Sequence, residues 1–192
     1  MKQIWLRKRI SFMNNDILEI LVSEQQLQEK IAELGKMISL DYEGRFPIVI
    51  CILKGAVIFL SDLIRQISIP VEIDFLSLSS YGDSTRSSGV VKIKKDIDCD
   101  IQGRHVIIAE DIVDSGLTLK YIETYFEQHQ PASIRICALL DKPAAHKTDL
   151  SIDYVGFEVG NEFVVGYGLD YAQKYRNLPY IGILKKEIYQ KE

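Results

Sequence analysis

The stretch VIIAEDIVDSGLTL, residues 106–119, joins an apolar run to a group of acidic residues and a small polar turn. Its first three residues are β-branched and unbroken, which is typical of a strand buried on both faces of a parallel sheet. Ligands of such sheets bind at the carboxyl ends of the strands. Glu110, Asp111 and Asp114 follow at that end, so the stretch predicts a parallel α/β fold with a ligand site at one edge of its sheet.

The turn after these acidic residues has the composition of an anion site. Ser115, Gly116 and Thr118 precede a segment with apolar residues at helical spacing, so the turn is expected to lead into a helix N-terminus. Free backbone N–H groups, a glycine that allows close approach and hydroxyl groups form a cradle suited to phosphate. Carboxylates beside a phosphate favour sugar hydroxyls, a hard cation or a base as further ligands.

Length and composition indicate one globular domain. The chain has 192 residues, of which 47% are hydrophobic and 26% charged, which is enough for one well-buried core and too little for two ordinary domains. We expect residues 13–192 to form this domain. Residues 1–12 are basic but lack the apolar segment of a secretory signal, and we expect them to form a disordered N-terminal extension.

Charge and cysteine usage narrow the function classes. A net charge of −4 and a pI near 5.5 give no basic surface for nonspecific binding to nucleic acid or anionic membranes. The longest apolar run, IVICIL, ends at Lys54 and is far shorter than the roughly 18 residues of a membrane span. Cys51, Cys99 and Cys137 form no CxxC pair and are interpreted as reduced thiols. These features predict a cytoplasmic protein with no nucleic-acid or membrane partner.

Strands and helices are expected to alternate along the chain. Ser23 and Gln26 form a capping box, so the first firm element is predicted to be an amphipathic helix. Residues 79–89 carry no aliphatic side chain and cannot pack into a core. The pattern predicts a mostly parallel, twisted sheet with helices on both faces. The predicted strands are the motif strand and residues 48–53, 71–78, 90–94 (antiparallel), 134–140, 154–157, 163–165 and 181–184, with a helix over residues 56–64 and another after the motif.

The motif resembles the 5-phosphoribosyl-1-pyrophosphate (PRPP) site of the type I phosphoribosyltransferases, in which two acids after an apolar strand precede D-[ST]-G-x-T. The resemblance runs from about residue 17 to the C-terminus through LKG, SxYG, EDIVDSGLT, DK and FVVGYGLDYxxKYR. These motifs are similar to those of the bacterial hypoxanthine and hypoxanthine-guanine enzymes. The resemblance implies the type I phosphoribosyltransferase fold, with a small hood and a flexible lid loop beside the sheet.

The resemblance also implies a reaction. Phosphoribose would pass from PRPP to N9 of a 6-oxopurine with Mg²⁺, giving IMP, and GMP where guanine is used, and releasing pyrophosphate in purine salvage. Glu110 and Asp111 would hold the ribose hydroxyls and, with Asp170, the metal, while Asp114 is the candidate catalytic residue that handles the proton at purine N7. The implied PRPP-binding set is Glu110, Asp111, Asp114, Ser115, Gly116, Leu117 and Thr118.

Pyrophosphate and lid residues follow from three other motifs. Lys54 and Gly55 match a loop that binds pyrophosphate through backbone N–H groups and often contains a non-proline cis peptide. Arg176 matches the family's pyrophosphate-binding arginine, whose guanidinium fork suits phosphate oxygens. Ser80, Tyr81 and Gly82 match the closing lid loop, which would exclude water from the reaction.

Four residues are implied to bind the purine. Lys142 would donate to the 6-oxo group, and because an ammonium has only donors, it disfavours adenine, which presents another donor there. Phe163 would lie over the purine face and backbone groups of Val165 would meet its exocyclic edge. Asp170 matches an acid that links this site to the metal.

The chain departs from the family after Lys142. Many relatives have arginines there, whereas this chain has Pro143 followed by Ala144, Ala145 and His146, so any phosphate or subunit contact of those arginines is in doubt. The three histidines show no metal-ligand spacing and are interpreted as ordinary surface or core residues.

Several alternatives remain open. Lys142 and the FVVGYGLD motif favour a 6-oxopurine over adenine or orotate, but they do not separate hypoxanthine, guanine and xanthine. A nucleotide-sensing RNA-binding regulator on the same fold is disfavoured by the acidic balance of the chain. By analogy with relatives, we expect a homodimer or a homotetramer.

Overall fold

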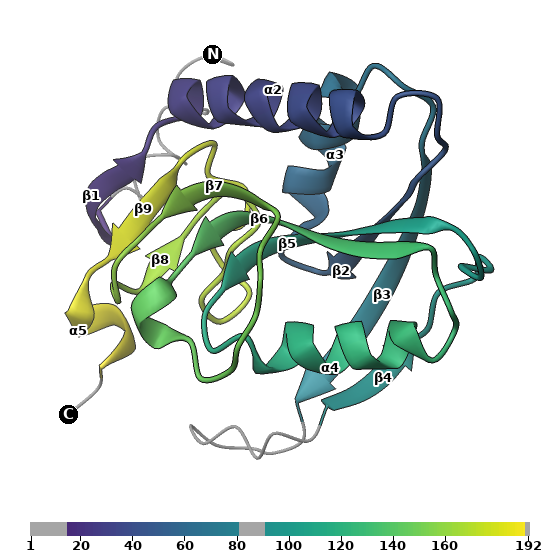
Figure 1. Ribbon diagram of the computed structural model, residues 1–192. Coiled ribbons are helices and arrows are strands. Elements are labelled where there is room, and N and C mark those ends of the chain that lie inside the picture. The colour runs from purple at the N-terminus through teal and green to yellow at the C-terminus, as the bar shows by residue number, and fades with distance from the viewer. Residues whose placement is uncertain (1–14, 81–90, 191–192) are drawn as a thin grey trace, which may run out of the picture. The chain divides into compact units, whose positions relative to one another are not determined.

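The computed structural model describes residues 15–80 and 91–190 (Figure 1). The expected extension of residues 1–12 and the lid residues Tyr81 and Gly82 lie outside this described part. The described residues form two compact units: the larger lies within Lys30–Asn161, and the smaller combines residues 15–29 with residues 162–190. No helix of the described part is long and apolar enough to cross a membrane.

The larger unit is built on a six-stranded sheet, in which only the pair β3 and β4 is antiparallel. The central strand β2 has the sequence IVICIL, which has no polar alternation because both faces of the strand are covered. The prediction of a mostly parallel sheet is confirmed. The spatial order is β4 (Val91–Lys95), β3 (Glu72–Ser80), β2 (Ile48–Leu53), β5 (His105–Val113), β6 (Ser133–Asp141) and β7 (Tyr154–Glu158).

Helices cover both faces of this sheet, with α3 (Val57–Gln66) and α4 (Leu117–Glu127) on opposite sides (Figure 1). The apolar side of α4 packs on alternate residues of the central strands and forms a buried cluster with them. On α2 (Glu24–Asp41), Gly35 lies so close to Gln66 of α3 that an added Cβ would lie 2.5 Å from the Gln66 Cβ. A short 3₁₀ turn, η1 (Pro143–Ala145), follows β6.

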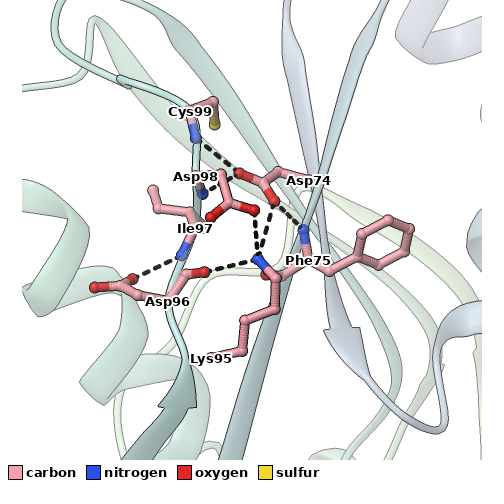
Figure 2. A network of polar contacts seen from close by, with 7 residues as sticks. All are labelled: Asp74, Phe75, Lys95, Asp96, Ile97, Asp98 and Cys99. Carbon is pink, nitrogen blue, oxygen red and sulfur yellow. Dashed lines mark hydrogen bonds and ion pairs between the residues drawn. The ribbon is translucent and has the colours of Figure 1, made fainter.

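An acidic residue fixes the chain after the β3–β4 pair (Figure 2). Asp74 is 6% exposed and accepts hydrogen bonds from the backbone N–H groups of Phe75 (2.6 Å), Asp98 (2.6 Å) and Cys99 (2.9 Å). The ammonium of Lys95 lies 3.6 Å from the same carboxylate. Burial by itself raises the pKa of Asp74, but the backbone bonds from Cys99 and Phe75 and the further bonds outweigh it and lower the pKa to about 2.

The smaller unit contains a three-stranded antiparallel sheet in the order β1 (Ile17–Val22), β9 (Ile181–Leu184) and β8 (Val164–Val165), followed by α5 (Lys186–Tyr189). Ile17, Val165 and Leu184 belong to its apolar core. This sheet corresponds to the expected small hood.

The N-terminal region differs from the prediction at one point. The capping box is confirmed, because Ser23 N donates to Gln26 Oε1 (2.9 Å) and Gln26 N donates to Ser23 Oγ (3.3 Å). The prediction that this helix is the first firm element is wrong, since β1 precedes it. Only the ends of β1 are buried while Leu18 and Ile20 are exposed, so the strand lacks the alternating pattern that a sequence can reveal.

Candidate active site

Strand register places the predicted residues of the larger unit along one edge of its sheet. In β5, Ala109 pairs with Cys51 of β2 and Val113 pairs with Asp141 of β6. The chain therefore leaves β2, β5 and β6 at the same carboxyl edge, where ligands of parallel sheets bind. Lys142 extends this pairing, because its backbone N donates to the carbonyl of Val113 at 2.9 Å.

Gly55 and Asp111 meet at this edge. A Cβ added to Gly55 would lie 1.5 Å from Asp111 Oδ2, so only glycine leaves room for the carboxylate in this position. The loop also contains a cis peptide bond between Leu53 and Lys54, in agreement with the family pattern, and Lys54 is exposed. The proposed pyrophosphate loop and the proposed ribose-binding acids are therefore in direct contact.

The neighbouring acid, Glu110, is partly buried, and its Oε2 atom is shielded from solvent without a hydrogen-bond partner among the described residues. Burial first, and then the negative charge of Asp111, raises the pKa of Glu110 well above its ordinary value. A buried oxygen without a partner costs free energy and is uncommon in folded proteins. A hydroxyl donor or a cation would satisfy it.

The turn after β5 forms the expected cradle. Gly116 has φ of 75° and is the N-cap of α4, whose N-terminus carries no side-chain cap. The left-handed backbone favours glycine here, and an added Cβ would also lie 2.9 Å from Thr148 Cγ2, so the Thr148 side chain would have to shift. A cavity of about 100 Å³ opens here, which is large enough to hold several water-sized groups. It is lined by Glu110, Ile112, Val113, Asp114, Ser115, Gly116, Thr118 and Leu119.

Four more of the predicted residues lie in the smaller unit. Phe163 is 37% exposed and stacks on Tyr189 of α5, with ring centroids 4.8 Å apart and an interplanar angle of 24°. Tyr171 meets Phe163 edge-on at 5.7 Å. Val165 is buried and pairs with Gly182 in the antiparallel sheet. The Phe163 ring is therefore packed against two other rings, and part of its surface is still open to a ligand.

Asp170 and Arg176, which the motifs assign to different roles, are bound to each other. Arg176 Nη2 lies 2.6 Å from Asp170 Oδ1, and Arg176 Nη1 donates to the carbonyl of Gly168 at 2.7 Å. Gln173 N donates to the second oxygen of Asp170 at 2.8 Å. The guanidinium of Arg176 is therefore held in a fixed orientation within this unit.

The structure thus groups the predicted residues by unit. Lys54, Gly55, Lys142 and the motif residues 110–118 share one sheet edge of the larger unit, while the other four lie together in the smaller unit. Among residues 15–80 and 91–190, no three His, Cys, Asp or Glu residues converge as metal ligands.

Two residues near the site were missed from the sequence. Asp141 and His146 are paired, with His146 Nε2 2.7 Å from Asp141 Oδ1. Asp141 is the acid of the DK motif, to which the sequence assigned no role, and His146 shows no motif spacing and was predicted to be an ordinary residue. Only the fold of the loop after β6 brings the two side chains together.

Comparisons with known proteins agree with this geometry. A family model described as phosphoribosyl transferase domain matches residues 18–172. The chain is 52% identical to the hypoxanthine-guanine phosphoribosyltransferase of Bacillus subtilis, over 93% of this chain and 99% of that protein. It is 54% identical to the bifunctional protein TilS/HprT of Listeria monocytogenes over 92% of this chain, and it spans only 27% of that longer relative.

A solved structure gives the same result for the fold. The hypoxanthine phosphoribosyltransferase of Staphylococcus aureus superposes with a TM-score of 0.91 at 45% identity, covering 94% of this chain and 98% of that one. The fold is that of the type I phosphoribosyltransferases. The chain belongs to the phosphoribosyltransferase family.

Proposed function

We propose that the chain is a purine-salvage enzyme that transfers 5-phosphoribosyl from PRPP to N9 of hypoxanthine, and of guanine, giving IMP or GMP and pyrophosphate. The observation that carries this proposal is a cavity of about 100 Å³ at the sheet edge, lined by Glu110 and by the N-terminal turn of α4, with Asp111 next to Glu110 in sequence and packed against Gly55. The 52% identity to the B. subtilis enzyme supports the choice of substrates.

Glu110 and Asp111 would hold the ribose and the metal. Glu110 Oε2 is buried and has no partner within the part of the chain that the structure describes, and carboxylate oxygens are the ligands that Mg²⁺ prefers, usually one or two of them together with substrate phosphates. The donor set therefore fits Mg²⁺. When bound, the ion would neutralise charge on the leaving pyrophosphate. Ribose hydroxyls would supply the donor that Glu110 otherwise lacks.

Ser115, Gly116, Leu117 and Thr118 would bind the 5-phosphate, with the first N–H groups of α4 as donors. Asp114 is exposed at the mouth of this turn. It would take the proton at purine N7 while N9 attacks C1′, a general-base contribution of roughly 10²- to 10⁴-fold. The carboxylates nearby would also favour the positive charge that develops on the ribose.

Lys142 would select the purine by donating to its 6-oxo group. Phe163, held by Tyr189 and Tyr171, would offer its open surface to the purine ring. Lys54, Gly55 and Arg176 would hold the pyrophosphate, and the backbone of Val165 would meet the exocyclic edge. Asp170 would link the purine site to the metal. We propose a homodimer or a homotetramer in the cytoplasm as the working state.

A product assay tests the proposal. The chain is incubated with PRPP, Mg²⁺ and one of hypoxanthine, guanine, xanthine or adenine, and IMP, GMP, XMP and AMP are measured. We expect IMP and GMP, abolished reversibly by EDTA. A dominant XMP product would favour the xanthine enzyme. Absence of all four products, with binding of structured RNA on a filter, would support the RNA-binding regulator instead.

A further inference from the structure

The loop after β6 is closed by a pair of side chains. His146 Nε2 lies 2.7 Å from Asp141 Oδ1, and because a carboxylate can only accept, the imidazole donates. The Asp141 side chain is 9% exposed and that of His146 20%. A hydrogen bond to a charged group in such a sheltered place is stronger than one in water. Between the two residues lie Lys142, the proposed purine donor, and the three residues of η1.

Two backbone hydrogen bonds link this loop to the end of β5 and to the turn that contains Ser115 and Gly116. Lys142 N donates to Val113 O at 2.9 Å, and Lys147 N donates to Ser115 O at 3.0 Å. Val113 and Ser115 flank Asp114. The segment 142–147 is therefore bonded at both ends to the chain that carries the proposed catalytic acid and phosphate cradle.

His146 is the side chain best placed to hold this segment. The side chains of Ala144 and Ala145 carry no polar group, and Pro143 lacks a backbone N–H. The hydrogen bonds of η1 itself are backbone bonds of Ala145 and His146 to Lys142 O and Pro143 O. The hydrogen bond from His146 to Asp141 therefore adds a side-chain contact between the end of η1 and the end of β6.

We propose that His146 is a positioning residue, which through Asp141 fixes Lys142 and the Ser115 turn relative to each other. The proposal rests on the proposed function, since it assigns His146 a role in presenting the purine donor.

The test compares His146→Ala with two variants that keep a donor, His146→Gln and His146→Arg, and with His129→Ala as a matched control. His129 is an exposed histidine after the end of α4. The bond between Lys142 and the purine exists in both the ground and transition states, so its misplacement raises KM more than it lowers kcat. We expect His146→Ala to raise KM for hypoxanthine roughly tenfold with kcat within about threefold. The Gln and Arg variants and the control should stay within about threefold of the wild type in both constants.

A second measurement does not depend on catalysis. Amide hydrogen exchange at Lys147, whose N–H is bonded to Ser115, should be faster in His146→Ala than in the wild type and restored in His146→Arg. Unchanged KM in His146→Ala, unchanged exchange at Lys147, or failure of both donor-bearing variants to restore KM would overturn the proposal. If the wild type forms neither IMP nor GMP, the proposed function fails, while the exchange at Lys147 still decides whether His146 anchors the loop.

Discussion

Gly55 shows how one residue without a side chain can serve a charged site. Asp111 Oδ2 occupies the space that a Cβ at this position would fill, because an added methyl group would lie 1.5 Å from that oxygen. Asp111 can escape the collision only by turning its carboxylate away. Placement of this acid therefore depends on Gly55.

Gly55→Ala should accordingly weaken PRPP binding. If Asp111 accepts ribose hydroxyls as proposed, displacing its carboxylate removes a charge-assisted interaction, so we expect KM for PRPP to rise about tenfold or more, measured by initial rates. Gly103→Ala is the control, because Gly103 has φ of 66° with nothing within 4 Å of its Cβ position. It should cost stability alone, about 1 kcal/mol in the free energy of unfolding, because alanine is strained in the left-handed conformation. Equal KM values for PRPP in both variants would contradict the role of Gly55.

Lys142→Ala tests purine recognition, again by changing one residue. Loss of the ammonium leaves the 6-oxo group without its donor, so KM for hypoxanthine and guanine should rise about tenfold and their preference over adenine should weaken. Lys120→Ala is the matched control, since Lys120 is exposed and pairs with Glu123 on α4. Unchanged purine preference in Lys142→Ala would show that another group reads the 6-oxo position.

At the scale of elements, Asp74 joins strand β3 to the chain that follows β4. Its carboxylate takes three backbone donors from Phe75, Asp98 and Cys99 (Figure 2). Because the pKa of Asp74 is lowered from 3.8 to about 2 in the folded protein, the folded state favours the ionised form. This contribution to stability is complete above about pH 4 and is lost as the pH falls through about 2.

Asp74→Asn should therefore lower the free energy of unfolding by about 2 kcal/mol at pH 7, since each pKa unit corresponds to about 1.4 kcal/mol. The difference from the wild type should shrink between pH 4 and pH 2, as followed by urea unfolding at each pH. Asp98→Asn is the control, because the side chain of Asp98 is 85% exposed, and it should change stability by less than about 0.5 kcal/mol. A difference from the wild type that is constant across this pH range would contradict the assignment.

Elements with a strong local pattern could be predicted from the sequence, and others could not. The run IVICIL of β2 and the helical spacing after Gly116 are visible in any window of the chain, and both elements formed as expected. Strand β1 was missed because Leu18 and Ile20 are exposed. Strand β8 is limited to Val164–Val165, which leaves Phe163 outside the strand. Strand β9, which pairs with both β1 and β8, is separated from each of them along the chain, so the local sequence pattern gives little information about these two strands.

For the whole molecule, the family resemblance predicted the type I fold, while the pairings inside the site needed the structure. Glu110, Asp111 and Gly116 belong to one contiguous motif whose chemistry can be read directly. The contact of Gly55 with Asp111 and the bond of His146 to Asp141 depend on loop geometry, which sequence spacing does not contain. The hood sheet likewise joins the two ends of the chain, in the order β1, β9, β8.

Asp114→Asn tests most directly whether the carboxyl edge of the larger sheet performs phosphoribosyl transfer. The amide keeps the size of the side chain but removes its charge and its basic lone pair. We predict that kcat for IMP formation falls roughly 10²-fold or more, while KM for PRPP changes far less. Asp100→Asn, at an exposed aspartate just before β5, should leave both constants unchanged. A near-normal kcat in Asp114→Asn would contradict the proposed role of Asp114 and of this sheet edge in phosphoribosyl transfer.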